Sequence, residues 1–150
     1  MNLVFSSKIQ KRSRGAVESL FFLNPRQYRV RDGILGALQE FGHPRLEEKD
    51  DNVYLCLGDK EAQTLFAFDG SRANGDPVGL VVFLRSSASD IVIVHLAVHP
   101  DYALHGRRAG LGLGLALIEK VKEIASRIVG VQRIVFFYRP EVVIRIGNQN

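Results

Sequence analysis

The 150-residue sequence lacks the features on which disulfide-linked, thiolate-rich and membrane-spanning proteins depend. A single cysteine, Cys56, excludes an internal disulfide and any zinc site built from several thiolates. No apolar run approaches the roughly 18 residues of a membrane span, and no internal repeat or low-complexity tract is present. The basic cluster near the start follows a very short apolar stretch, the reverse of a secretory signal. We therefore expect a cytoplasmic protein without a membrane partner.

What the sequence does contain is typical of one globular domain. Hydrophobic residues make up 46% and charged residues 24%, a balance that excludes a disordered or fibrous chain. Twenty Lys and Arg against sixteen Asp and Glu leave a formal charge of +4. That charge favours an anionic partner but does not separate nucleic acid from a phosphorylated cofactor. We predict a single domain over residues 1–150.

The hydrophobic periodicity changes along the chain and indicates both helices and strands. Apolar residues at helical spacing predict helices over residues 13–23, 31–41 and 110–128. Alternation and β-branched residues predict strands over residues 3–9, 53–57, 64–68, 78–85, 91–98, 133–138 and 141–146. The four strands between residues 53 and 98 have the spacing of an antiparallel meander. Asp69, Asp76 and Asp90 fall between strands, where we expect them to make local turn hydrogen bonds.

A basic, glycine-rich turn joins the strand that ends near Pro100 to the strongest predicted helix. It has the sequence HGRRAGLGLG over residues 105–114. Glycines let the backbone approach a ligand, and a helix start adds unpaired N–H groups and a partial positive charge. Arg107 and Arg108 would add full charges and bidentate hydrogen bonds. The turn therefore predicts a phosphate-binding site; the alternative is that its glycines only allow tight helix packing.

Two common phosphate-binding motifs fit this turn poorly. A Walker loop ends in Gly-Lys-Ser/Thr, and that triplet does not occur in the sequence. A dinucleotide-binding turn needs G-x-G-x-x-G, but after Gly110 and Gly112 the third glycine position is Leu115.

A third motif fits better. Val98-His99-Pro100 followed by Arg107-x-x-Gly110-x-Gly112 resembles the acetyl-CoA site of the GCN5-related N-acetyltransferase (GNAT) family. In that family Arg/Gln-x-x-Gly-x-Gly/Ala follows a strand that ends near Val-x-Pro. The resemblance covers about residues 1–138, in the family order of strand, two helices, three-stranded meander, helix and strand.

The resemblance implies an α/β (α+β) fold of the acyl-CoA N-acyltransferase type, with a mixed, mostly antiparallel sheet flanked by helices. It further implies that acetyl-CoA (coenzyme A) is the cofactor and that the protein is an acyltransferase. Its reaction would move the acetyl group to an amine by direct attack on the thioester. The acceptor would be a small-molecule or peptide amine, which the sequence does not identify.

The resemblance also implies which residues hold the cofactor. Backbone amides of the turn would hold the pyrophosphate, and backbone groups at the strand end would pair with the pantetheine arm. The implied cofactor-binding residues are Leu96, Ala97, Val98, Arg107, Arg108, Ala109, Gly110, Leu111 and Gly112. An N–H at Val98 would stabilise the tetrahedral oxyanion. Holding the amine beside the thioester would supply much of the remaining rate, so no side-chain nucleophile is required.

The sequence departs from the family pattern in two places. The loop between Pro100 and Arg107 is longer than usual, so Arg108 is an alternative to Arg107 as the cofactor contact. After the strand at 133–138 the family commonly has another helix, whereas here only residues 139–150 follow, so we expect a shortened C-terminal part. The strand at 141–146 would pair into the sheet or be exchanged with a second subunit, which would make the protein a homodimer.

Three side chains are candidates for proton transfer. Tyr138, at the end of its strand, is the nearest hydroxyl to the family tyrosine that protonates the departing thiolate; it is otherwise a cap on the core. His95 and His99 would share the face of Ile91 and Ile93 in a regular strand. A neutral imidazole there would accept the ammonium proton of the amine, directly or through water. The alternative for both is a structural histidine.

Other functions fit the sequence less well than a transferase. His95 and His99 are four residues apart, but they fall on a predicted strand and turn and not on a helix with an acidic partner as in a zinc hydrolase, so we predict no metal. The N-terminal region is basic and allows a nucleic-acid or protein-binding module, but no RNA motif, zinc finger or recognition helix is visible, which disfavours nucleic acid. A catalytically degenerate protein that only binds the cofactor is the remaining alternative.

Overall fold

The computed structural model describes residues 2–22, 42, 44–58, 60–71, 75–102, 112–137 and 139–147. The strands are β1 (Leu3–Ser6), β2 (Ile9–Gln10), β3 (Pro44–Lys49), β4 (Asn52–Leu57), β5 (Lys60–Glu61), β6 (Gln63–Asp69), β7 (Gly79–Arg85), β8 (Asp90–Val98), β9 (Arg133–Phe136) and β10 (Arg139–Arg145). The helices are α1 (Arg14–Phe22), α3 (Leu113–Ser126) and two short 3-10 turns, η1 (Lys11–Ser13) and η3 (Pro100–Tyr102). The predicted mixed α/β class is confirmed.

The larger sheet has six strands in the order β1-β6-β7-β8-β9-β10. Its neighbours are antiparallel except β8 and β9, which are parallel. Parallel neighbours need a long crossover connection, and α3 lies in the connection between these two strands. The predicted antiparallel meander is confirmed for β6, β7 and β8, and the mostly antiparallel character of the sheet is confirmed with it.

The prediction that β4 belongs to this meander is wrong. β4 instead forms a second, four-stranded sheet with β2, β3 and β5. The partner strand β3 was not predicted, because its sequence PRLEEK is mostly charged and has one aliphatic side chain, the buried Leu46. The expected strand at 3–9 likewise divides into β1, in the large sheet, and β2, in the small one.

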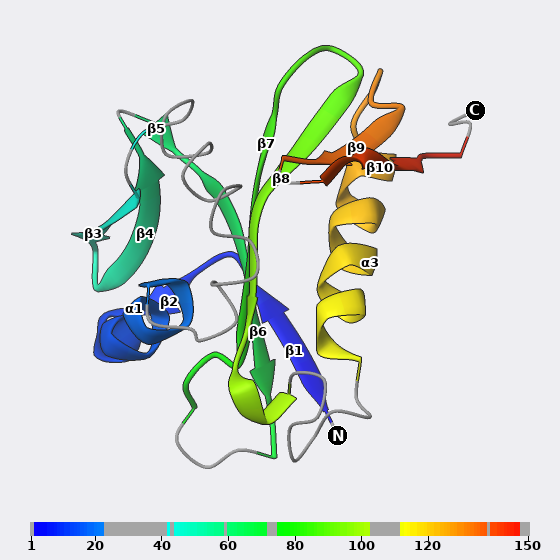
Figure 1. Cartoon of the computed structure of the whole chain (residues 1–150). Coiled ribbons are helices and arrows are strands. Elements are labelled where there is room, and N and C mark those ends of the chain that lie inside the picture. The colour runs from blue at the N-terminus through cyan, green and yellow to red at the C-terminus, as the bar shows by residue number, and fades with distance from the viewer. Residues whose placement is uncertain are drawn as a thin grey trace.

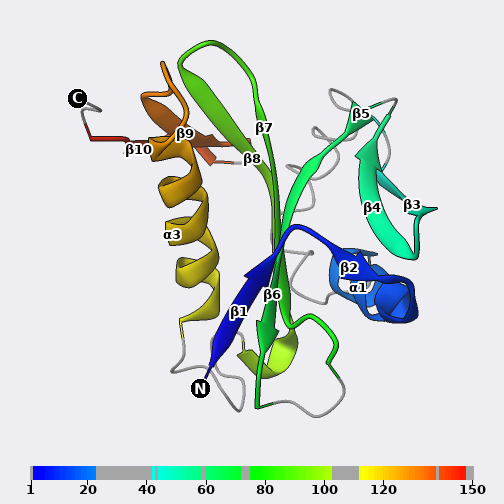
Figure 2. The same ribbon diagram turned by 180° about the vertical axis from the view of Figure 1, so that it is seen from behind.

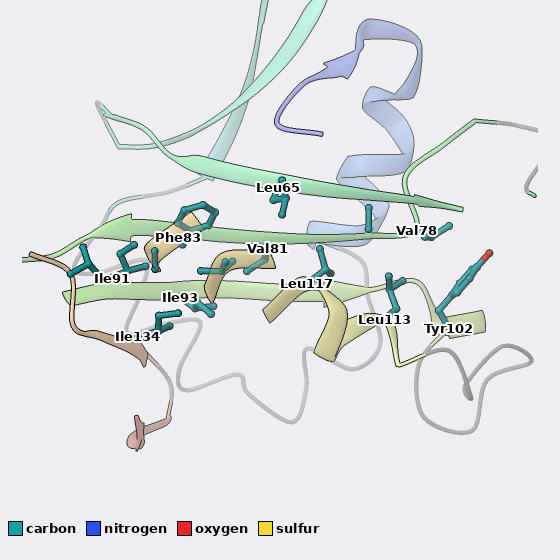
Figure 3. Close-up of a cluster of buried hydrophobic side chains, with 14 residues drawn as sticks. Leu65, Val78, Val81, Phe83, Ile91, Ile93, Tyr102, Leu113, Leu117 and Ile134 are labelled. Carbon is teal, nitrogen blue, oxygen red and sulfur yellow. The ribbon is translucent and has the colours of Figure 1, made fainter. Parts of the chain in front are cut away.

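The large sheet is covered on both faces (Figures 1 and 2). α3 lies along one face, and α1 with the small sheet lies against the other. On the α3 side, Val81 and Ile93 of the sheet pack in one buried cluster with Leu113 and Leu117 of the helix (Figure 3). On the opposite side, a second cluster joins the large sheet to α1 and the small sheet. Its members from those three units include Leu80, Val82, Val94, Val17, Leu20, Val53 and Leu55.

The helices lie close to their predicted bounds. α3 falls inside the predicted range 110–128 and buries every fourth residue: Leu113, Leu117, Val121 and Ala125. Arg127 donates to Glu123 at 2.9 Å. The helix predicted over 13–23 is η1 followed by α1, and Ser13 Oγ donates to Asp76 at 3.0 Å. The helix predicted over 31–41 lies outside the described residues.

The strand predicted over 141–146 pairs with β9 of its own chain, the first of the two arrangements expected for it. The register passes directly from the Arg139–Phe136 pair to the Val143–Val135 pair, which leaves a bulge in β10. Pro140, which has no N–H to donate, lies in that bulge. β10 is therefore regular from Val143 onward.

Candidate functional site

The candidate site begins where β8 and β9 diverge. The parallel register joins Asp90–Ile93 of β8 to Arg133–Phe136 of β9, and the Phe137 N–H donates to the Ile93 carbonyl at 3.0 Å. Beyond Ile93, β8 continues along β7 as far as Val98. Its edge on the β9 side therefore extends past the end of the parallel ladder.

A bidentate ion pair joins β8 and β9 at the opposite end of their parallel ladder. Arg133 Nε and Nη2 donate to the two carboxylate oxygens of Asp90 at 2.9 and 2.6 Å. The hydrogen bond from Arg133 lowers the pKa of Asp90, and the hydrogen bond from Ser89 lowers it by a smaller amount. The predicted local bond is present, since Ser89 Oγ donates to Asp90 Oδ1 at 3.1 Å, but the main partner of Asp90 is Arg133, which is more than 40 residues away in the sequence.

A bulge in β8 changes which face its histidine occupies. Val82 of β7 pairs with His95, whereas its neighbour Phe83 pairs with Ile93, so Val94 is an extra residue in β8. Residues directly opposite each other share a face, which places His95 with Val82, on the side of α1 and the small sheet. The expectation that His95 shares a face with Ile93 is therefore wrong.

His95 is almost completely buried at that position. Its side chain is 5% exposed, and desolvation lowers the pKa of the imidazole to about 4. The ring is therefore neutral at physiological pH. A neutral ring can accept a proton, but one with this pKa is a weak base. A catalytic role for His95 stays a prediction.

His99 follows the last residue of β8 and is held by its own turn. Its N–H donates to the Val78 carbonyl at 2.8 Å, and its Nδ1 accepts the Asp101 N–H at 3.1 Å. Because Nδ1 is an acceptor, the neutral ring carries its proton on Nε2. His99 is suited in this tautomer to donate a hydrogen bond to an oxygen rather than to take a proton. Its catalytic role also stays a prediction.

A buried carboxylate anchors the turn after β8. Tyr102 of η3 donates its hydroxyl hydrogen to Asp69 Oδ2 at 2.5 Å, and both residues are only 3% exposed. The Ser71 N–H and hydroxyl donate to Asp69 Oδ1 at 2.9 and 2.6 Å, which is the predicted turn chemistry. Tyr102 was missed, since no local pattern links residues this far apart. The contact attaches η3, where the path to the glycine-rich turn begins, to the end of β6.

The start of α3 lies beside the end of β8. A Cβ added to Gly114 would be 3.8 Å from Val98 Cγ2 and 3.9 Å from Leu96 Cδ2. Gly112, the N-cap of α3, has φ +59°, and an added Cβ there would meet no atom within 4 Å. The first N–H groups of a helix have no acceptor within the helix and carry its positive dipole end. A helix end with the positive end of its dipole and an extended strand end therefore meet here.

The other predicted site residues are distributed as follows. Ala97 is in β8, and its side chain belongs to the cluster on the α1 side. Six predicted residues lie outside the described part of the chain: Arg107, Arg108, Ala109, Gly110, Leu111 and Tyr138. The structure thus brings Leu96 and Val98 together with the first turn of α3.

Within the described ranges, no group of three or more His, Cys, Asp or Glu side chains is placed to hold a metal ion. None of the helices that the structure describes is both long and apolar enough to cross a membrane.

Comparison with known proteins gives matches in structure only. No protein-family model matches the sequence, and no curated protein matches it. An IAA acetyltransferase from Bacillus cereus is 19% identical, with a TM-score of 0.47 over 90% of this chain and 65% of that one. A GNAT family acetyltransferase from Elizabethkingia anophelis with acetyl-CoA bound is 13% identical, with a TM-score of 0.49 over 90% and 64%.

An acetyltransferase from Streptococcus agalactiae is 17% identical, with a TM-score of 0.49 over 89% of this chain and 71% of that one. The chain therefore spans less than two thirds of the first two structures, which it covers to 65% and 64% of their length. These three solved structures are acetyltransferases.

Proposed function

We propose that the protein is an acetyl-CoA-dependent N-acetyltransferase that acts on a small-molecule or peptide amine. The proposal is carried by the approach of the α3 N-terminus to the end of β8, where Gly114 lies against Leu96 and Val98. The motif Arg107-x-x-Gly110-x-Gly112 leads into the helix at that point. The resemblance of this motif to the acetyl-CoA site of the GNAT family implies a diphosphate at the same point.

The residues present fit the diphosphate of coenzyme A. Gly112 has the left-handed backbone conformation that glycine favours and open space beside it. The first turn of α3 carries no acidic side chain that would repel an anion. Its backbone N–H groups, together with Arg107 and Arg108, would hold the diphosphate. Acetyl-CoA, when bound, would supply an acetyl thioester activated toward amines.

The strand end is suited to the pantetheine arm. Leu96, Ala97 and Val98 lie on β8 beyond the last residue that pairs with β9. The His99 hydrogen bond to Val78 sets the phase of β8, so the backbone groups of Ala97 face Leu80 of β7 and those of Leu96 and Val98 face the other edge. In the proposed complex Leu96 and Val98 pair with the amides of the arm along this edge. The Val98 N–H then lies near the thioester and stabilises the oxyanion that forms during attack.

The two histidines are suited to different steps: His99 to donating a hydrogen bond, and His95 only weakly to accepting a proton. His99 donates through Nε2 and orients an oxygen of the reactants, while His95 is a weak base because burial lowers its pKa to about 4. Only the fraction of the amine that is already neutral can then attack the thioester, because His95 takes up the ammonium proton poorly. Tyr138 is the proposed donor to the departing thiolate.

Thermal denaturation with and without acetyl-CoA tests the proposal. A ligand present at about 100 times its dissociation constant adds about 2.7 kcal/mol to the free energy of unfolding, so the midpoint should rise measurably. Thiol release with a panel of amines then separates an enzyme from a protein that only binds the cofactor. An unchanged midpoint would overturn both cofactor-based readings.

Two substitutions at one position locate the site. Gly112→Glu places a negative charge where the diphosphate should lie and should abolish the midpoint rise. Gly112→Gln has nearly the same size and the same backbone strain at φ +59° without the charge, so it should retain more of the rise. The midpoints of both variants without ligand, compared with that of the parent, measure the backbone strain that they share. Equal midpoint rises in both variants would place the diphosphate elsewhere.

A further inference from the structure

Tyr102 joins three elements beside the proposed cofactor site. It is the last residue of η3, the turn that follows β8, and it is only 3% exposed. Its hydroxyl donates to Asp69 Oδ2 at the end of β6, at 2.5 Å. Its side chain belongs to the α3-side cluster, in which Figure 3 places it at the same end as Leu113. Tyr102 therefore links the ends of β6 and β8 to the first turn of α3.

The acceptor of this hydrogen bond is itself held in place. Asp69 pairs with Leu3 in the register of β6 and β1, and it is also 3% exposed. Its other carboxylate oxygen, Oδ1, accepts the Ser71 N–H and hydroxyl at 2.9 and 2.6 Å. Hydrogen bonds of this kind offset the cost of burying a carboxylate. Asp69 thus gives Tyr102 a fixed point on the sheet.

The backbone holds η3 at the end nearer to β8. The His99 N–H donates to the Val78 carbonyl at 2.8 Å, and the Tyr102 N–H donates to the His99 carbonyl at 2.8 Å. The rings of His99 and Tyr102 meet edge to face, with 6.3 Å between their centroids and an interplanar angle of 84°. The Tyr102 hydroxyl adds a side-chain attachment at the other end of η3.

The position of Tyr102 in the chain gives this attachment a consequence for binding. The motif residues Arg107 and Gly110 lie in sequence between Tyr102 and Gly112. Asp69 holds the first of these two ends, and the second is the N-cap of α3. Fixing both ends of a segment reduces the conformations open to it. A ligand that orders the segment then loses less free energy on binding.

We infer that Tyr102 is a positioning residue for the cofactor: its hydrogen bond to Asp69 fixes η3 against the start of α3 and so raises the affinity for coenzyme A. The inference rests on the proposed function, in which coenzyme A is the cofactor. Tyr102 does not touch the reactants, because its hydroxyl is directed to Asp69 and its ring is buried in the cluster. Its loss lowers the fraction of molecules that are ready to bind, and the apparent affinity falls in proportion.

Calorimetric titration with coenzyme A, well below the unfolding midpoints, tests the inference. Tyr102→Phe removes only the hydroxyl, and the dissociation constant should rise by about three- to tenfold. Ser71→Ala is the matched control, since it removes a hydroxyl donor from the same carboxylate without detaching η3. Ile91→Val, at the opposite end of the cluster in Figure 3, controls for a general loss of stability. Both controls should bind like the parent.

Hydrogen exchange tests the attachment without ligand. The amide of residue 102 belongs to a short turn and exchanges by local opening, so it should exchange faster in Tyr102→Phe and at the parent rate in both controls. Unchanged exchange in Tyr102→Phe would overturn the inference. So would equal affinity of that variant and the parent, or an equal loss of affinity in Ser71→Ala. A parent that does not bind coenzyme A would overturn the proposed function and this inference with it, whatever the exchange rates show.

Discussion

At the scale of single residues, burial determines what the imidazole of His95 can do. Desolvation lowers its pKa from the ordinary value of 6.5 to about 4, since charging the ring would remove a cation from water. The same burial links the stability of the fold to pH. Between those two values the unfolded chain binds the His95 proton and the folded chain does not.

We expect the free energy of unfolding to fall as the pH is lowered from about 6.5 to about 4. The loss from this one group should be roughly 3 kcal/mol, from the size of the shift. Urea denaturation across this pH range measures it, and His95→Gln should flatten the slope whatever it does to the stability at neutral pH. Asp90 and Glu48, whose pKa values are lowered, lose their contributions only below their own unfolded values, nearer pH 4. An equal slope in the variant would contradict the assignment.

At the scale of secondary-structure elements, one glycine sets how closely α3 approaches the sheet. A Cβ added to Gly79 of β7 would be 3.1 Å from Leu117 Cδ1 and 3.3 Å from both Leu113 Cδ2 and the Ala97 carbonyl oxygen. The helix therefore packs directly on the backbone of β7. This contact holds the first turn of α3 near the end of β8, where the proposed cofactor site lies.

Gly79→Ala should lower the free energy of unfolding by about 1–3 kcal/mol, because the added methyl group must displace Leu113, Leu117 or the strand. Gly15→Ala is the matched control. Gly15 is exposed in α1 with no atom within 4 Å of an added Cβ, so alanine there should raise stability by roughly 0.5–1 kcal/mol. Urea denaturation of both variants checks the pair. A Gly79→Ala protein as stable as the parent would show that the helix is not in close contact there.

At the scale of the whole molecule, the middle of the large sheet is its most protected part. β6, β7 and β8 contribute to the clusters on both faces, whereas the two-residue strand β5 pairs only with β4 among the described strands. Elements that bury both faces open only when the whole fold opens. Short edge strands open locally at lower cost.

Native-state hydrogen exchange should reflect this difference. Protected amides of β7 and β8, such as those of Val81, Val82 and Ile93, should exchange only through global unfolding, with a free energy that falls with denaturant like that of the whole protein. The amides of Lys60 and Glu61 in β5 should exchange faster and with little denaturant dependence. Uniform exchange through all strands would mean that the two sheets unfold as one unit with no local opening.

Local pattern alone determined several features of this protein. The mixed α/β class, the meander of β6 to β8 and the apolar stripe of α3 follow from the spacing of apolar residues, which each segment carries by itself. The position of Gly112 at the helix start likewise follows from the motif. The predicted roles of Arg107 to Leu111 and of Tyr138 lie outside the described residues and stay predictions.

Tertiary structure decided the features that depend on partners distant in sequence. The small sheet exists because the charged strand β3 pairs with β4, and the bulge at Val94 turns His95 to the α1 side of the sheet. The Asp69–Tyr102 and Asp90–Arg133 contacts join residues separated by 33 and 43 positions. The periodicity of a segment shows which of its faces is buried and which is exposed to water. It does not show which other segment it packs against, and strand pairing, bulges and buried polar contacts depend on that partner.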